Sequence, residues 1–176
     1  PHTATLAMVA AAAMAGVPLA NGFLSKEMFF AEAVTAGGQM RFGWLLPVAV
    51  TVAGVFAVAY SLRFIHDVFF NGEPIDLPRT PHEPPRWMKV PVEILVVLCL
   101  LVGIFPAQTV EPLLAVAAAA VLQGPLPEHD LALWHGVSPA LWMSVIALAG
   151  GVLLYLGRRP LYALHDRLEG RLDARA

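Results

Sequence analysis

The sequence predicts an all-α membrane protein: a polytopic transmembrane helix bundle with about four spans, the first discontinuous, plus a short interfacial helix. Of the 176 residues, 58% are hydrophobic and 14% are charged, whereas soluble domains carry about 25% charged residues. Three windows, 3–25, 42–62 and 136–157, contain no Asp, Glu, Lys or Arg. Each is about as long as the 20 residues that cross a bilayer. The net charge of −2 argues against a nucleic-acid partner, so the lipid bilayer is the expected partner.

We expect the four crossings at about 3–36, 43–70, 91–106 and 138–157. The apolar stretch 110–122 reaches only about 20 Å as a helix, and Pro106 and Pro112 separate it from the third crossing. It is predicted as a short interfacial or re-entrant helix, with a fifth crossing as the alternative. In the last crossing, Ala147 and Gly151 form a small-xxx-small pair that predicts a helix-packing seam.

Positive charge predicts the orientation of the chain in the membrane. Arg and Lys residues gather in the loop 71–90 and in the tail 158–176, while the connection 107–138 has neither. The positive-inside rule therefore places that loop and the tail in the cytoplasm. Residues 1–157 form the expected transmembrane part, and 158–176 an amphipathic cytoplasmic tail.

The first crossing contains a cluster of helix-breaking residues. Gly16, Pro18, Asn21 and Gly22 fall within seven positions, and Ser25 is a plausible N-cap for a second helix. Neither half is long enough to cross a bilayer alone. Together they predict one crossing with a break near its middle, which is tolerated only where protein or a hydrated cavity surrounds the backbone.

Lys26 follows the break and is the main candidate for function. Low dielectric and a helix N-terminus both disfavour an ammonium ion, so this amine could exchange a proton near neutral pH. Glu27 and Glu32 would oppose that effect. Ionisable groups inside a membrane are functional candidates by default. The alternative is that the break is a surface loop and Lys26 extends to the lipid headgroups.

Arg63, His66 and Asp67 share one helix face, at positions i, i+3 and i+4. His66 could pass protons between the membrane interior and the cytoplasm, oriented by Asp67. The alternative is an interfacial cluster in which Arg63 binds lipid phosphates.

No metal site, cofactor or enzyme activity is expected. The polar groups His82–Glu83 and Glu128–His129–Asp130 with His135 fall in Pro-rich or loop segments, whereas a zinc site needs three or four ligands on rigid elements. The sequence has no Gly-rich phosphate loop and no catalytic triad pattern.

Residues 14–27, MAGVPLANGFLSKE, resemble the late broken helix of the antiporter-like subunits shared by Mrp-type multisubunit cation/proton antiporters and respiratory complex I. Three later motifs are similar to the large A-type subunit of the Mrp antiporters: SLRF at 61–64 with VFF at 68–70, PHEPP at 81–85, and LWHG at 133–136. The family commonly has two prolines where this chain has VPLA, so the resemblance does not fix the shape of the break.

The resemblance implies a fragment from the second half of that subunit, in the plasma (inner) membrane of a prokaryote. In the family, the lysine of the broken helix belongs to an intramembrane proton path, and Lys26 and Glu27 fall on the lysine and its acidic neighbour. The implied partners are other antiporter subunits, H⁺ and a monovalent cation. Two alternatives stay open: an antiporter-like subunit of a proton-pumping NADH:quinone oxidoreductase, and a structural bundle for docking other subunits.

Overall fold

A computed structural model describes residues 2–72, 82–124, 136–160 and 162, and this part of the chain is all α-helical. The helices are α1 (His2–Ala15), α2 (Asn21–Gly38), α3 (Leu45–Phe69), α4 (Arg86–Ile104), α5 (Pro106–Thr109), α6 (Glu111–Leu122) and α7 (Pro139–Leu156). The predicted all-α class is confirmed. The tail beyond Tyr162 and the cluster at 128–135 lie outside the described residues.

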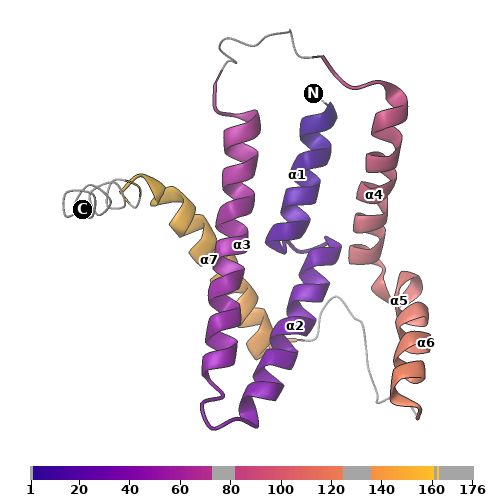
Figure 1. Ribbon diagram of the computed structural model, residues 1–176, viewed down its shortest axis with the longest axis vertical. Helices are drawn as coiled ribbons and strands as arrows, with labels where there is room; N and C mark the ends of the chain where they lie inside the picture. The colour runs from indigo at the N-terminus through magenta and orange to yellow at the C-terminus, as the bar shows by residue number, and fades with distance from the viewer. Residues whose placement is uncertain (1, 73–81, 125–135, 161, 163–176) are drawn as a thin grey trace, which may run out of the picture.

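The helices α1 and α2 follow each other along the bundle, and the short connection 16–20 displaces the axis of α2 from that of α1 (Figure 1). On one side of this pair lies α3, which α7 crosses, and these two helices make the most extensive contact of the bundle. On the other side lies α4, which contacts both α1 and α2. The interrupted first helix is therefore enclosed by helices on two sides, as the sequence predicts for irregular backbone inside a membrane.

Several helix ends differ from the predicted ones. The helix α2 begins at Asn21, so Ser25 is not its N-cap; Ser25 lies inside the helix, and its hydroxyl donates to Gly22 O at 3.2 Å. The helix α4 begins at Arg86 and contains Pro91, which has no backbone N–H to donate to the carbonyl four residues earlier. At α7, the Ser138 side chain accepts a hydrogen bond from Leu141 N at 3.0 Å and caps the helix.

The core lies where α2, α3 and α7 meet. Phe30 of α2 is 1% exposed, and its ring packs beside Gly54 of α3 in a cluster that includes Ala147 and Met143 of α7. The predicted seam on α7 is confirmed. A Cβ built on Gly151 would lie 2.4 Å from Val58 Cβ, so the two backbones approach closely only because this side chain is absent.

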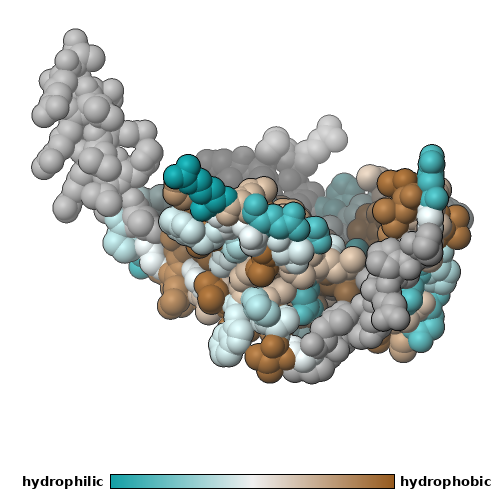
Figure 2. Space-filling model, turned by 90° about the horizontal axis from the view of Figure 1, so that it is seen from below, coloured by the Kyte–Doolittle hydropathy of each residue, from teal (hydrophilic) through white to brown (hydrophobic). Residues whose placement is uncertain are grey.

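Outside this core, large apolar side chains are exposed. They cover most of the outward surfaces of α3, α4 and α6, and apolar residues are visible along the flanks of the molecule in Figure 2. Three described helices, α3, α4 and α7, are long and apolar enough to cross a membrane. So much exposed apolar surface is unstable in water but is expected in contact with lipid or with neighbouring helices.

The ends of the long helices group as the charge pattern predicts. The end of α3 and the start of α4 lie at one end of the bundle, together with the start of α1 (Figure 1), and the end of α7 lies beside the last turns of α3, where the ring of Tyr155 is 6.0 Å from that of His66. At that end of the bundle, His2 Nε2 lies 2.6 Å from Glu93 Oε1, and Thr3 Oγ1 donates to Glu83 Oε2 at 2.6 Å. These contacts attach the start of α1 to the start of α4.

The short helix α6 runs in the same general direction as α2 (Figure 1). This orientation is closer to that of a re-entrant helix than to that of a helix lying in the membrane surface. The reason lies at its start, where Phe105 and the four-residue α5 connect it to the end of α4 without a sharp reversal. The described part of the chain buries none of the residues of α6.

Replacing Gly151 by alanine tests the α3–α7 contact. The new methyl group would overlap Val58, and overpacking of this kind costs about 1–3 kcal/mol. We therefore expect the midpoint of thermal unfolding of the assembled membrane protein to fall by several degrees. Gly38→Ala is the matched control, because a Cβ there meets nothing within 4 Å. Equal midpoints for the two variants would contradict the close approach of α3 and α7.

Candidate functional site

The break between α1 and α2 is built from a defined helix end. Gly16 has φ +77°, and the amides of Gly16 and Val17 donate at 3.0 Å to the carbonyls of Ala13 and Ala12. This pair of hydrogen bonds around a left-handed glycine is a Schellman motif. It satisfies two of the four carbonyls that every helix leaves without a partner at its C-terminus. Leu19, with φ +74°, then turns the chain into α2.

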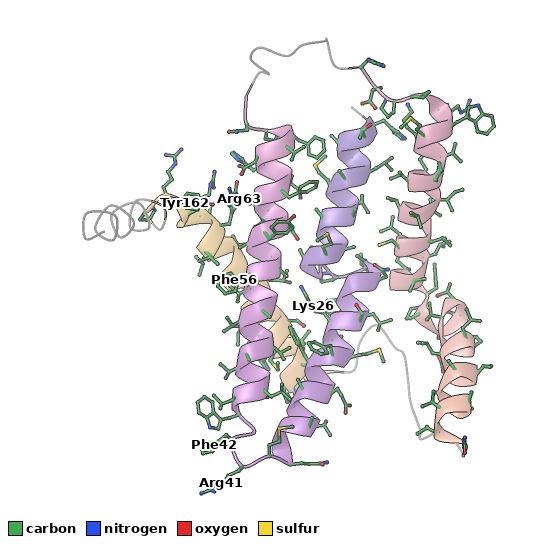
Figure 3. All side chains as sticks on the ribbon, viewed as in Figure 1. Lys26, Arg41, Phe42, Phe56, Arg63 and Tyr162 are labelled. Atoms are coloured by element: carbon green, nitrogen blue, oxygen red, sulfur yellow. The ribbon has the colours of Figure 1, made fainter. Side chains whose placement is uncertain are left out.

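Lys26 satisfies the other two carbonyls. Its Nζ donates to Ala15 O at 2.7 Å and to Met14 O at 3.3 Å. The side chain comes from the second turn of α2 and lies beside the break at mid-height in the bundle (Figure 3). Lys26 is half-buried. All four terminal carbonyls of α1 are thus bonded, two by backbone amides and two by one amine.

This position reverses part of the electrostatic prediction. The sequence suggested that Lys26 follows the start of a helix, where the partial positive charge disfavours an ammonium. In the structure α2 starts at Asn21, and Nζ instead contacts the C-terminus of α1. Helix C-termini carry partial negative charge and stabilise cations. The helix end therefore favours the charged lysine, while its half-buried position opposes the charge.

Two glycines make this geometry possible. A Cβ on Gly16 would lie 2.8 Å from Lys26 Cδ and 3.1 Å from Nζ, so the lysine side chain occupies the space that any other residue would fill. A Cβ on Gly22 would lie 1.9 Å from Ala13 O. The two half-helices therefore overlap at a backbone contact that only glycine permits.

The helix α4 closes the other side of the break. A Cβ on Gly103 would lie 2.3 Å from Leu19 O, and Cys99 Sγ donates to Asn21 Oδ1 at 3.0 Å. Pro18 lies exposed in the turn between the half-helices. Of the predicted break residues, Gly16, Gly22 and Asn21 thus have specific contacts. The contribution of α4 was not predicted, because nothing in the sequence links residues about 80 positions apart.

The two candidate acids of α2 differ in their surroundings. Glu27 is 7% exposed, and it shares a helix face with Phe23 and Phe30, which belong to the buried side of α2. Glu32 is exposed. The structure therefore buries Glu27, and not Glu32, within the helix bundle.

Arg63, His66 and Asp67 lie together at the end of α3, away from Lys26 (Figure 3). Arg63 Nε donates to Asp67 Oδ2 at 3.1 Å, and His66 Nδ1 lies 3.1 Å from Asp67 Oδ1. The predicted one-face cluster is confirmed, but it forms a second site rather than part of the lysine site. Sequence reasoning missed its partners on the other helix, where the ring of Tyr155 of α7 lies 6.0 Å from that of His66.

No group of three or more His, Cys, Asp or Glu side chains in the described ranges is arranged to hold a metal ion. What the lysine site offers chemically is an amine with two fixed acceptors, on a helix whose next residue, Glu27, is buried. Such an arrangement can hold and transfer a proton, and it contains no nucleophile with an activating base.

Comparison with known proteins identifies the family. No protein-family model matches the chain. It is 59% identical over 155 residues to the probable K⁺/H⁺ antiporter A/B subunit of Rhizobium meliloti, covering 88% of this chain and 16% of that protein. It is 31% identical over 178 residues to the Na⁺/H⁺ antiporter A1 subunit of Staphylococcus aureus strain JH9, covering 98% of this chain and 22% of that protein.

A solved structure agrees with these relatives. The fold matches a chain in the structure of the Mrp complex from Dietzia sp. DQ12-45-1b with a TM-score of 0.76 and 34% identity. The match covers 95% of this chain and 17% of that one, so the sequence corresponds to a limited segment of much longer proteins. The chain is therefore a multi-pass membrane segment homologous to the large A-type subunit of the Mrp Na⁺/H⁺ or K⁺/H⁺ antiporters, and it belongs to that family.

Proposed function

We propose that this segment carries one station of the proton path in a monovalent cation/proton antiporter of a prokaryotic plasma membrane, with Lys26 as the group that takes up and releases the proton. The observation that carries the proposal is the half-buried Lys26 amine bound to the terminal carbonyls of α1. The names of the relatives, all cation/proton antiporter subunits, support the same class of transport.

The hydrogen bonds of Lys26 suit reversible protonation. An ammonium has three N–H donors, and two of them point to Met14 O and Ala15 O. A neutral amine still has two donors, so it can keep both carbonyl bonds and lose only the third proton. The side chain then needs no large movement between its charged and neutral states, and the transferred proton leaves in the direction away from α1.

Glu27 is the proposed neighbour of Lys26 in this path. Its buried carboxyl group on the α3- and α7-facing side of α2 lies where a proton could continue toward those helices. His66, oriented by Asp67 at the end of α3, is proposed as a later station near the cytoplasmic surface. Side chains or water from other parts of the whole protein would have to connect these groups.

The membrane arrangement follows from the helix lengths. We propose four crossings: α1 with α2 as one interrupted crossing, then α3, α4 and α7, with α6 not crossing on its own. The contacts of Gly103 with Leu19 and Ala20 place the end of α4 beside the break of the first crossing. The loop 71–90 and the tail are proposed to be cytoplasmic, and other antiporter subunits are proposed as partners.

Substitution of Lys26 tests the relay in the full antiporter complex. Lys26→Met removes the amine, and we expect cation-driven proton movement in everted vesicles, followed with a pH-sensitive dye, to fall to background. Lys26→Arg keeps a cation that can bond to the carbonyls but does not release its proton in proteins. We expect this variant to assemble and to be inactive as well.

The arginine variant separates a relay from a structural role. If Lys26 only stabilises the end of α1, Lys26→Arg should keep most of the exchange activity, and that result would overturn the proposal. Lys89→Met is the control, because Lys89 is the other lysine of the sequence and lies near the start of α4. It should leave exchange unchanged.

Gly16→Ala tests the position of the amine. Alanine at φ +77° adds strain of about 1–3 kcal/mol, and its methyl group would push Lys26 away from Ala15 O. We expect a large loss of exchange in assembled complexes. Gly72→Ala is matched in strain, at φ +97°, but meets nothing within 4 Å, so it should lower thermal stability alone. Equal exchange by both variants would show that the lysine position does not matter.

A further inference from the structure

A groove of about 390 Å³ runs between α3 and α7, near the end that carries Arg63, and the proton path does not use it. On the α3 side it is lined by Phe56, Ala59, Tyr60 and Arg63. These four residues have the spacing i, i+3, i+4 and i+7, which places them on one helix face. Along that face, the groove changes from apolar in the middle of the helix to cationic at its end (Figure 3).

The α7 side repeats this gradient. Leu154 and Tyr155 line the groove within α7, and Arg158 and Tyr162 line it just beyond the helix end. The Arg158 guanidinium carbon lies 4.2 Å from the centre of the Tyr155 ring, and that of Arg63 lies 5.4 Å from the centre of the Tyr162 ring. Both cations are thus held over aromatic faces at the same end of one groove.

Each of the two guanidinium groups donates one hydrogen bond to an acceptor in the described part of the chain. Arg63 donates through Nε to Asp67, an exposed pair, and Arg158 donates through Nη1 to Tyr155 O at 3.3 Å. Asp67 is the carboxylate that faces this end of α3 and contacts His66 as well. Among the described residues, one acid therefore accompanies two arginines, which leaves this group of side chains with an excess of positive charge.

We propose that this α3–α7 groove binds an anionic phospholipid, with the headgroup phosphate between Arg63 and Arg158 and an acyl chain along Phe56 and Tyr60. Guanidinium groups match phosphate oxygens in geometry as well as charge. The gradient from apolar to cationic also follows the change from hydrocarbon to headgroup across a leaflet. The inference requires that α3 and α7 cross the bilayer, as proposed above, but it does not depend on proton transfer by Lys26.

Native mass spectrometry of the full complex in detergent, titrated with phosphatidylglycerol or phosphatidylcholine, measures this site directly. We expect tighter binding of phosphatidylglycerol, and a loss of about fivefold in its affinity for Arg63→Gln or for Arg158→Gln, since each basic group near a membrane surface contributes about that factor. Arg159→Gln removes the same charge at the next residue, which is exposed and does not line the groove. It should bind phosphatidylglycerol like the unmodified protein.

Four outcomes would overturn the proposal. The arginine variants could bind phosphatidylglycerol unchanged, the two lipids could bind equally, or Arg159→Gln could lose as much affinity as Arg158→Gln. Displacement of the lipid by an equal concentration of inorganic phosphate would instead indicate a site for a free anion. If a glutamine variant fails to assemble, Arg158→Lys keeps the charge and should retain most of the preference for phosphatidylglycerol. Because binding is measured, a failed proton relay would not affect the result.

Discussion

The two hydrogen bonds from Lys26 to the end of α1 are the interaction on which the site depends. A helix that ends inside a membrane leaves four carbonyls without partners, and hydrocarbon offers none. The Schellman turn at Gly16 bonds the carbonyls of Ala12 and Ala13, and Lys26 bonds those of Met14 and Ala15. The same amine therefore stabilises the break and is positioned by it, so removal of the side chain does not separate its structural role from the proposed transport role.

Close backbone contacts explain why this break is enclosed. Glycines at three positions let neighbouring elements approach without side chains between them: Gly22 against α1, Gly103 against the break, and Gly151 against α3. Within a membrane the hydrophobic effect between helices is weak, and packing of small residues replaces it. The helix backbones thus approach closely at these three positions, while many large apolar side chains lie on the outer surface.

Two groups of ionisable side chains in this segment lie in different surroundings. Lys26 and Glu27 lie within the bundle, whereas Arg63, His66, Asp67 and Arg158 gather at one end of α3 and α7. Within the bundle, a charged side chain is energetically unfavourable unless fixed dipoles stabilise it. At the end of α3 and α7, the charges lie beside aromatic rings at the depth expected for headgroups, where they can contact lipid phosphate without a large desolvation penalty. One segment therefore combines a proposed transport group with a proposed lipid contact.

The sequence by itself determined the helical class, the interruption near Gly16 and the shared face of Arg63, His66 and Asp67, because these depend on local hydrophobicity, glycine and proline positions and helical periodicity. Only the tertiary structure decided what the charged groups contact. The start of α2 at Asn21, the attachment of Lys26 to α1 rather than to its own helix, and the alignment of α6 with the bundle all depend on packing between distant segments. Local sequence patterns do not specify contacts between distant segments, so the electrostatic surroundings of Lys26 could not be derived from the sequence.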